Sequence, residues 1–414
     1  MIDKRVSLRD YVRGFSKPFW AANVSELFER IAYYGMAPVL VPYLTQVRGF
    51  DESAAIRVGG NLGFIVYGLT ILSGMLADWL GYRRAMILAY ALLAAGYVGV
   101  GAAPSFPAVV GALALVALGA SIIKPAITGT VQRTCSEERR PVGFSIYYTL
   151  VNIGGFLGPN LSGAVAAGAG LALVFPTCAG AIAVALGLVL LLFRDDVAAA
   201  ETPKRRLVDL LRDFGGILTT PRLMALFVLV AGFWSLFFQF YGAFTTYLTQ
   251  DLGVSQQRAN FIISLDAALI IAFQVVTGYL TRNWTTARAV WIAAFIGTAG
   301  YGVIGLAPSA SLAAAGVVVF AIGEMIYSAH FYKYLGSLAP AGQEGMYLGF
   351  AFLPIALGSL IAGWIGGPMA TWARTSLHAP EKMFWGFGVV GLAAAVGLWL
   401  HATVYAAKDA QAEV

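Results

Sequence analysis

Long apolar runs follow one another along almost the whole chain, and they constrain the fold more than any other feature. An α-helix needs about 20 mostly apolar residues to cross the hydrocarbon core of a bilayer, and about twelve stretches of this sequence meet that requirement. Because a backbone in lipid must satisfy its hydrogen bonds internally, each run predicts a helix. We therefore expect an all-α polytopic membrane protein with spans near residues 19–46, 55–79, 84–103, 107–132, 141–166, 170–193, 222–250, 255–281, 285–307, 310–337, 343–371 and 381–405.

The composition agrees with this interpretation. Of the 414 residues, 59% are hydrophobic and 12% are charged, whereas a soluble domain is about half apolar and about a quarter charged. No Walker A, HExxH or Gly-x-Ser-x-Gly motif stands out, so we expect neither ATP-driven transport nor enzymatic activity. The two cysteines, Cys135 and Cys178, form no disulfide or metal-binding pattern, and we expect no cofactor.

A polar and basic segment divides the spans into two groups of six. It contains Arg194, Lys204, Arg205, Arg206 and Arg212. We expect an N-terminal six-helix half at residues 1–193, a cytoplasmic linker at 194–221 and a C-terminal six-helix half at 222–414.

Lysine and arginine residues are concentrated in alternate loops. They crowd the N-terminus, follow the second span as Arg83 and Arg84, follow the fourth span, and recur in the linker. The intervening loops carry only scattered charges such as Arg48 and Arg374. The positive-inside rule therefore predicts a cell-membrane protein with both termini in the cytoplasm. The formal net charge of +6 then reflects topology and not nucleic-acid binding.

The first span contains charged residues at membrane depth. On a helix, Glu26, Glu29, Arg30, Tyr33 and Tyr34 fall on one broad face. Intramembrane charge is costly unless it is paired or faces a water-filled cavity, so it indicates a functional site. The alternative is a set of buried ion pairs that only hold helices together.

Three further charged residues are expected to be buried at membrane depth. Lys124 brings the buried charges of the first half to two acids and two bases, a neutral set, whereas Asp266 and Glu324 make the second half acidic. A cavity with one positive and one negative wall suits a zwitterion, and Arg30 is shaped for bidentate carboxylate binding. The alternatives are that Asp266 and Glu324 only pack helices together and that Lys124 extends to the membrane interface.

A short motif follows the second span. Its residues are Gly74, Asp78, Gly81, Arg83 and Arg84, and the pattern resembles the signature that the major facilitator superfamily carries between spans 2 and 3. Asp78 can pair with the two arginines across a tight glycine turn, which predicts a cytoplasmic gate. The alternative is that these charges only set the topology. The resemblance implies the major facilitator fold of two six-helix halves.

Within that superfamily, several motifs resemble the proton-dependent oligopeptide transporter family. Residues 26–35 read ELFERIAYYG, similar to the family's ExxERFxYYG signature, with Ile31 in place of Phe. Tyr67 lies eleven positions before Asp78, as the tyrosine of that family's second span does. A specific match occurs at residues 144–154 and a further one at 121–127, and looser matches occur at 233–239 and 323–328.

The resemblance implies proton-coupled import of di- and tripeptides or related zwitterions by alternating access. The residue that matches Glu324 would meet the amino terminus of a peptide, and those that match Arg30 and Lys124 would meet its carboxylate. We expect the pocket to be lined by Tyr33, Tyr34, Tyr67, Asn152 and Gln239 and the proton to be coupled through Glu26, Glu29, Arg30, Lys124, Asp266 and Glu324. A small peptide or zwitterion and the lipid bilayer are the expected partners of a monomer.

The chain also departs from the family pattern. Asp266-Ala267 stands where the family commonly has Asn-Pro, and Ala351 where it commonly has Trp. These departures keep a second hypothesis open, in which a transporter with the same fold exports a drug or carries another metabolite. A receptor or scaffold that does not transport is a third. We expect the aromatic runs Phe237-Phe238 and Trp385–Phe387 to face lipid or the membrane interface.

Overall fold

The computed structural model describes residues 14–194, 219–338 and 349–412, together with residues 208, 212, 215 and 216. Every regular element in these ranges is helical. The long helices of the first half are α2 (Lys17–Pro42), α3 (Glu52–Gly68), α4 (Thr70–Leu80), α5 (Tyr82–Ala102), α6 (Phe106–Thr134), α7 (Arg140–Ala169) and α8 (Val174–Leu192). Those of the second half are α10 (Pro221–Gln239), α12 (Gln256–Thr281), α13 (Thr286–Ile304), α14 (Ala310–Ser337), α16 (Leu353–Thr375) and α17 (Met383–Ala412).

Most of these helices can cross a membrane. In the described ranges, nine are long and apolar enough to do so, and α3 with α4 forms a tenth span that is bent by 54°. Helices α2 and α7 are also long enough, at 26 and 30 residues, and α2 carries the charges of Glu26, Glu29 and Arg30. The predicted all-α polytopic fold is confirmed. The segment expected to link the halves, residues 194–221, lies mostly outside the described residues.

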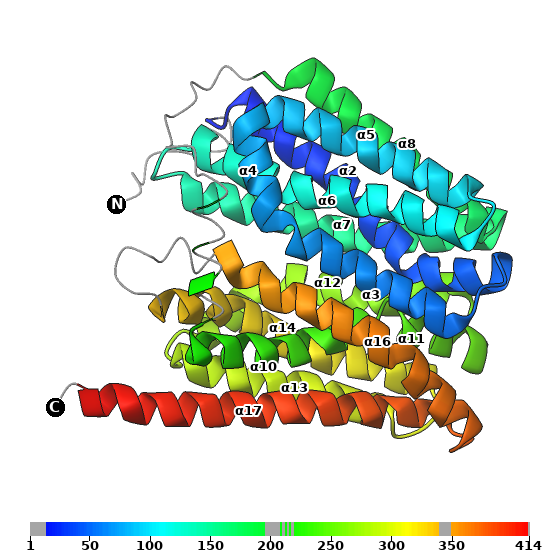
Figure 1. Ribbon diagram of the computed structural model, residues 1–414, viewed down its shortest axis with the longest axis vertical. Helices are drawn as coiled ribbons and strands as arrows, with labels where there is room; N and C mark the ends of the chain where they lie inside the picture. Colours follow the sequence, from blue (N-terminus) through cyan, green and yellow to red (C-terminus); the bar gives the residue numbers. More distant parts are fainter. Residues whose placement is uncertain are drawn as a thin grey trace.

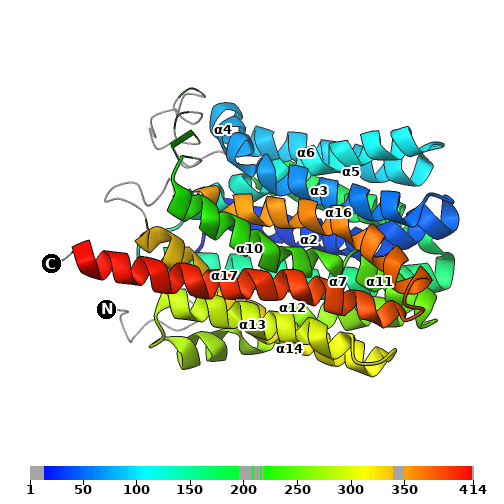
Figure 2. The same ribbon diagram turned by 60° about the horizontal axis from the view of Figure 1, so that its bottom comes forward.

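The helices form two bundles that lie one above the other in Figure 1. Helices α2 to α8 pack against one another in the upper bundle, and α10 to α17 do so in the lower one. The first residues of α2 and the last described residues of α17 lie at the same end of the molecule (Figures 1 and 2). We call this the terminal end, and the opposite end the distal end.

Two pairs of helices make most of the contacts between the bundles, α3 with α16 and α7 with α12. The contact between α3 and α16 involves small residues near the middle of both helices. A Cβ atom added to Gly60 would lie 2.5 Å from the Cα atom of Gly363, and Ser359 donates a 2.9 Å hydrogen bond to the carbonyl of Gly60. The backbones of α3 and α16 can come this close only because neither glycine carries a side chain.

The second pair, α7 with α12, is held by amide side chains. Asn160 donates a 2.9 Å hydrogen bond to the hydroxyl of Ser264. Asn260 donates a 2.9 Å hydrogen bond to the carbonyl of Pro159 and a 3.0 Å one to the hydroxyl of Ser162. These bonds satisfy polar groups that lipid could not. They also place the closed contact between the bundles at the distal end.

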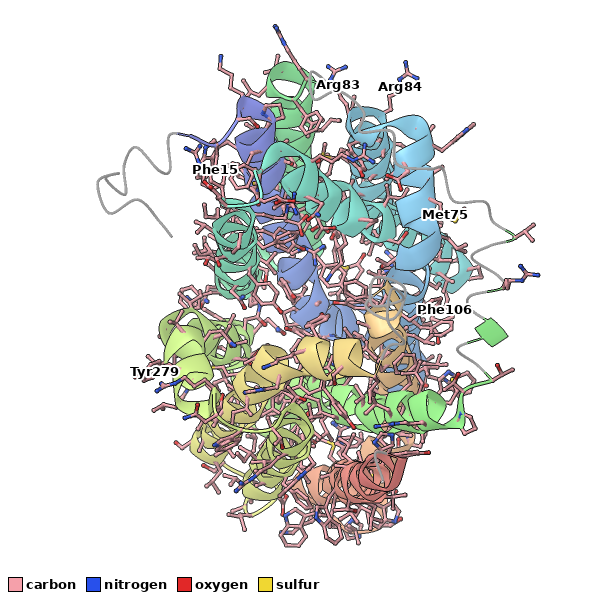
Figure 3. All side chains as sticks on the ribbon, turned by 90° about the vertical axis from the view of Figure 1, so that its left-hand side faces the viewer. Phe15, Met75, Arg83, Arg84, Phe106 and Tyr279 are labelled. Carbon is pink, nitrogen blue, oxygen red and sulfur yellow. The ribbon has the colours of Figure 1, made fainter. Side chains whose placement is uncertain are left out.

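At the terminal end a cavity of about 330 Å³ lies between α7, α12 and α14. Figure 3 looks onto this end, with Arg83 and Arg84 at its rim. The cavity is lined by Ser145, Tyr148, Thr149, Asn152, Ile270, Ile271, Gln274, Val275, Ser328 and Tyr332.

Candidate functional site

The charged residues of α2 form one buried cluster. Their exposed fractions are 0% for Glu26, 0% for Glu29 and 1% for Arg30. The Nε atom of Arg30 lies 2.5 Å from Oε2 of Glu29 and 3.3 Å from Oε1 of Glu26. The spacing of four residues between Glu26 and Arg30 brings them together on one helix face. Pairing of this kind is what allows the three charges to remain buried.

Two tyrosines of the same helix cover the guanidinium group. Its central carbon lies 5.2 Å from the ring centre of Tyr33 and 5.8 Å from that of Tyr34, within cation–π range. Arg30 is therefore held in place by acids and aromatic rings together.

Lys124, on α6, points into the same region. Its Nζ atom lies 4.8 Å from the ring centre of Tyr67 and 5.4 Å from that of Phe352. It also interacts electrostatically with Arg30 and both glutamates of α2. The structure thus places this lysine beside the cluster and not at the membrane interface.

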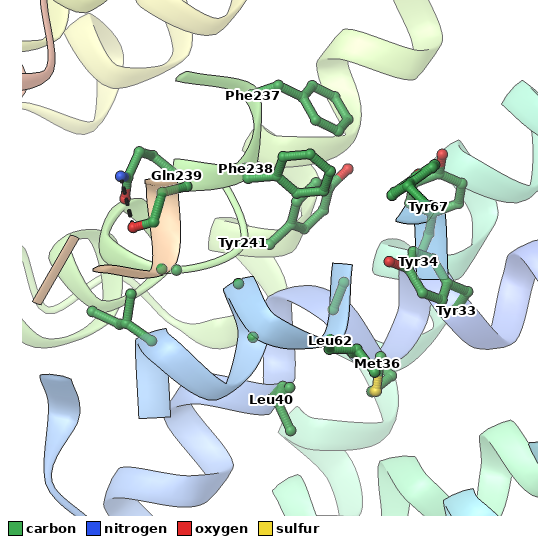
Figure 4. Close-up of a pocket in the computed structure, with 17 residues that line it drawn as sticks. Tyr33, Tyr34, Met36, Leu40, Leu62, Tyr67, Phe237, Phe238, Gln239 and Tyr241 are labelled. Atoms are coloured by element: carbon green, nitrogen blue, oxygen red, sulfur yellow. Dashed lines mark hydrogen bonds between the residues drawn. The ribbon is translucent and has the colours of Figure 1, made fainter. Parts of the chain in front are cut away.

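A narrow cavity lies between the bundles next to this cluster (Figure 4). Tyr33, Tyr34 and Tyr67 of the first half face Phe238 and Tyr241 of the second half across it. The ring centres of Tyr34 and Tyr241 are 6.3 Å apart, and those of Tyr67 and Phe238 are 5.9 Å apart. Its volume of about 40 Å³ admits only a few water molecules, so the rings must separate before a larger molecule can enter.

Gln239 lines this cavity but is already engaged. Its Nε2 donates a 3.1 Å hydrogen bond to the carbonyl of Ala362 on α16. Its Oε1 is buried and has no hydrogen-bond partner among the described residues. The oxygen is therefore the atom of this side chain that is available to a ligand.

A second small cavity adjoins the first, because both are lined by Tyr34, Phe237 and Tyr241. It contains the two acids of the second half, Asp266 on α12 and Glu324 on α14. Their exposed fractions are 7% and 8%. Each contributes a buried carboxyl oxygen without a hydrogen-bond partner among the described residues, Oδ1 of Asp266 and Oε2 of Glu324.

Asn152 joins this cavity to the terminal end. It lines both the acidic cavity and the larger one between α7, α12 and α14. Its Nδ2 donates a 2.9 Å hydrogen bond to the carbonyl of Tyr148 in its own helix. Asn152 thus lies on the route between the acidic cavity and the terminal end.

The expectation for one aromatic run was wrong. Phe237 is 8% exposed and lines both small cavities, and Phe238 lines the first. Tyr241, in the turn after α10, lines both cavities as well, and the sequence analysis did not select it. In the other run, Phe387 is buried whereas Trp385 is 47% exposed. The apolar run that contains Phe237 and Phe238 gave no indication of which side faces the partner bundle.

The motif after the second span is arranged differently from the expectation. Asp78 forms a 3.0 Å ion pair with Arg133 of α6 and accepts a 2.9 Å hydrogen bond from the Tyr82 hydroxyl. Arg83 instead donates to the carbonyls of Leu190 and Phe193 at the end of α8, at 3.0 and 2.9 Å. The pair expected between Asp78 and Arg83 or Arg84 is therefore replaced by a pair to α6.

The glycines of the motif have separate structural roles. Gly81 adopts φ +82° at the junction of α4 and α5, a conformation that favours glycine. Gly74 faces Pro125 on α6, where a Cβ atom would make an ordinary contact at 3.6 Å. Arg84 is exposed at the terminal end.

An ionic cluster at the distal end was not anticipated. Arg374 of α16 forms ion pairs with Glu52 of α3 and with Asp251, at 2.5 and 2.7 Å. The sequence pattern alone indicates only a scattered loop charge at Arg374. Arg374 lies 123 positions after Asp251 and 322 positions after Glu52. No sequence pattern indicates that charges this far apart meet.

Two bundles of long apolar helices around buried, charged cavities define the class of this protein, a multi-pass membrane protein built like a secondary transporter. The chain belongs to the Major Facilitator Superfamily, whose family model matches residues 24–363. The resemblance to peptide transporters is confirmed by curated relatives. The chain is 31% identical over 167 residues to dipeptide and tripeptide permease B of Yersinia enterocolitica, and 31% identical over 179 residues to a di-/tripeptide transporter of Lactococcus lactis.

These matches are partial. They cover 39% and 41% of this chain, and about a third of each relative, 34% and 35%. Solved structures match over nearly the whole fold. A POT family transporter in complex with 5-aminolevulinic acid has a TM-score of 0.80 at 18% identity and covers 94% of this chain and 98% of its own. The peptide transporter POT in complex with sulfate has a TM-score of 0.78 at 21% identity, with 94% of each chain covered.

Proposed function

We propose that this protein is a proton-coupled symporter that imports di- and tripeptides or related zwitterions by alternating access. The observation that carries the proposal is the charge on the two sides of the joined cavities. Arg30 and Lys124 lie near the wall formed by the first bundle, and Asp266 and Glu324 line the wall formed by the second. A molecule with a carboxylate at one end and an ammonium at the other matches this arrangement.

The proton coupling follows from the cluster on α2. Glu26 and Glu29 are both paired with Arg30. A substrate carboxylate that captured Arg30 would leave a buried glutamate without its partner, and that glutamate would then take up a proton. Proton and substrate would each favour the binding of the other, because coupling between two binding sites is reciprocal.

Alternating access is supported by where the bundles touch. The contacts of Arg374 with Glu52 and of Asn160 with Ser264 lie in the distal halves of their helices. With both termini in the cytoplasm, as the basic loops predict, the distal end would be extracellular and this conformation would face inward. We further propose that the protein acts in the cell membrane as a monomer, with protons as the coupling ion and no cofactor.

A second candidate function is supported by Asp266 and Ala351, the two departures from the peptide-transporter pattern. A transporter that exports a drug or moves another metabolite would use the same bundles with a different pocket. Its substrates would include compounds without a carboxylate for Arg30.

Uptake into proteoliposomes tests the proposal. We expect a labelled dipeptide to accumulate when an inward proton gradient is imposed and to equilibrate without accumulation in its absence. Glu29→Gln should abolish the gradient-driven accumulation, because a glutamine cannot carry the proton. Glu137→Gln, at an exposed acid, is the matched control and should retain accumulation.

The outcomes separate the candidates. Accumulation that requires the gradient and Glu29 supports the symporter. Uptake that ignores the gradient would overturn the coupling, and the absence of binding and flux for a broad peptide panel would overturn the peptide assignment. Gradient-driven extrusion of a cationic drug would favour the second candidate.

A further inference from the structure

The acidic cavity contains one more carboxyl group than a zwitterion needs. Asp266 and Glu324 come from different helices, and both line the same small cavity, where their carboxyl groups lie close enough to repel each other. Each is more than nine-tenths buried. An ammonium group needs only one carboxylate to balance its charge, so the second carboxyl group requires its own explanation.

The pair has no positive partner in the part of the chain that the structure describes. Among the residues that line this cavity there is no arginine, lysine or histidine. The remaining titratable groups that face the pair are tyrosines, whose hydroxyls carry no charge near neutral pH. They come from α2, α7, α14 and the turn after α10, and are Tyr34, Tyr148, Tyr241 and Tyr327.

The next charged groups are already engaged elsewhere. Glu29 and Arg30 pair with each other behind Tyr34. His330, further along α14, lies 2.9 Å from the hydroxyl of Thr281. The charge of the acid pair is therefore balanced by what enters the cavity.

Two buried carboxylates this close repel each other strongly, and they cannot both stay charged without a cation. A shared proton reduces the charge of the pair from −2 to −1, which one ammonium group then neutralises. A ligand with two ammonium groups neutralises the pair without the proton. The unpartnered Oδ1 of Asp266 and Oε2 of Glu324 provide one free acceptor for each group.

We infer that Asp266 and Glu324 together form a site for the cationic end of the substrate, in which a second positive charge on the substrate replaces a bound proton. The inference rests on the proposed function, because it concerns molecules that enter the same cavities. It names a substrate class: small peptides or amino compounds with a second amino group close to the first.

The consequence is a selectivity that depends on pH. At low pH the pair holds its proton, and a substrate with one ammonium group is bound without penalty. As the pH rises, that substrate must still retain the proton, whereas a substrate with two ammonium groups displaces it. The preference for the second substrate therefore grows with pH, by at most about tenfold per pH unit for one exchanged proton.

Binding of two matched dipeptides to the purified full-length protein tests this inference. Ornithyl-alanine and norleucyl-alanine have side chains of the same length and differ by one charge. Their affinities are compared between about pH 5 and about pH 6.5, where peptide amino groups remain almost fully charged. We expect the ratio of affinities to shift towards ornithyl-alanine as the pH rises, by threefold or more per unit.

Two variants locate the effect. Asp266→Asn removes one carboxyl group with little change of shape, so the ratio should become independent of pH. Glu381→Gln removes a buried carboxyl group outside these cavities, where Glu381 pairs with Lys382, and the ratio should vary as in the unaltered protein. Melting temperatures of both variants report whether they remain folded.

A ratio that does not change with pH in the unaltered protein would overturn the inference, whatever the variants do. A change that persists in Asp266→Asn would also overturn it, since another group such as His330 would be responsible. If neither dipeptide binds at any pH, 1,4-diaminobutane and butylamine are compared in the same way. Diamine binding that strengthens with pH and requires Asp266 would then support the acid pair while the peptide assignment fails.

Discussion

Arg374 extends from one bundle to the other and donates a hydrogen bond from Nη1 to Oε2 of Glu52, at 2.5 Å. The same guanidinium group binds both carboxyl oxygens of Asp251 in its own bundle, at 2.7 to 3.1 Å. The bond to Asp251 orients the guanidinium group, and the bond to Glu52 joins the bundles at the distal end.

Glu52→Gln should therefore favour opening of the distal end. The variant keeps the pair between Arg374 and Asp251, and it replaces a charge-assisted bond between partly buried groups with a neutral one, at a cost of about 1 kcal/mol. The population of the distal-open state should rise about fivefold. Spin labels at the exposed positions 47 and 377 report this as a larger share of long distances.

The contact between α3 and α16 gives a second test of closure. A valine at Gly60 would overlap the backbone of Gly363, so Gly60→Val should hold the distal ends apart while each bundle stays folded. The same pair of spin labels should give longer distances, and transport should stop. Gly111→Val, at a glycine with open space around it, should leave both unchanged. Normal transport by Gly60→Val would show that this contact is not part of the cycle.

Removal of Arg30 should destabilise the fold. Arg30→Ala leaves the buried carboxylates of Glu26 and Glu29 without their partner, which costs about 3–5 kcal/mol. The quadruple variant Glu26→Gln, Glu29→Gln, Arg30→Ala, Lys124→Met should regain most of this stability because no charge of the cluster is left buried and unpaired. Denaturation of the purified variants measures both effects. Equal stability of Arg30→Ala and the unaltered protein would contradict the pairing.

Asp78→Asn should impair transport but leave the stability of the fold almost unchanged. Asp78 is half exposed, so the loss of its pair with Arg133 should change stability by less than about 1 kcal/mol. If the motif acts as a gate at the terminal end, the variant should still slow uptake severalfold. The initial rate of uptake and the melting temperature, measured on the same preparation, separate these effects. A large loss of stability would indicate a purely structural role.

The positions of the helices could be predicted from the sequence because each helix needs its own apolar run in lipid. Span ends were less accurate where the apolar pattern continues through a break. The run predicted at 222–250 contains the turn Phe240–Gly242 after α10, and the run at 55–79 is bent between α3 and α4. The apolar pattern alone does not reveal that the chain changes direction at either place.

The site could be predicted only in part. Charges such as Glu29 and Asp266 are conspicuous in apolar runs because lipid makes them costly. Phe237 and Tyr241 could not be selected in this way, since an aromatic ring is as well placed against lipid as against a cavity. The partners of Asp78 and Arg374 could not be found either, because they depend on which helix ends meet.

The rings of Tyr34, Phe237 and Tyr241 stand between the two small cavities. A molecule that reached both the arginine and the acid pair would have to pass between these rings and hold them apart. These rings would then select ligands by length, because a ligand too short to pass between them would contact only one of the two charged groups. Ligands could differ chemically in their middle part, where flat aromatic faces accept many shapes. Their two ends would have to carry the charges that the arginine and the acid pair bind.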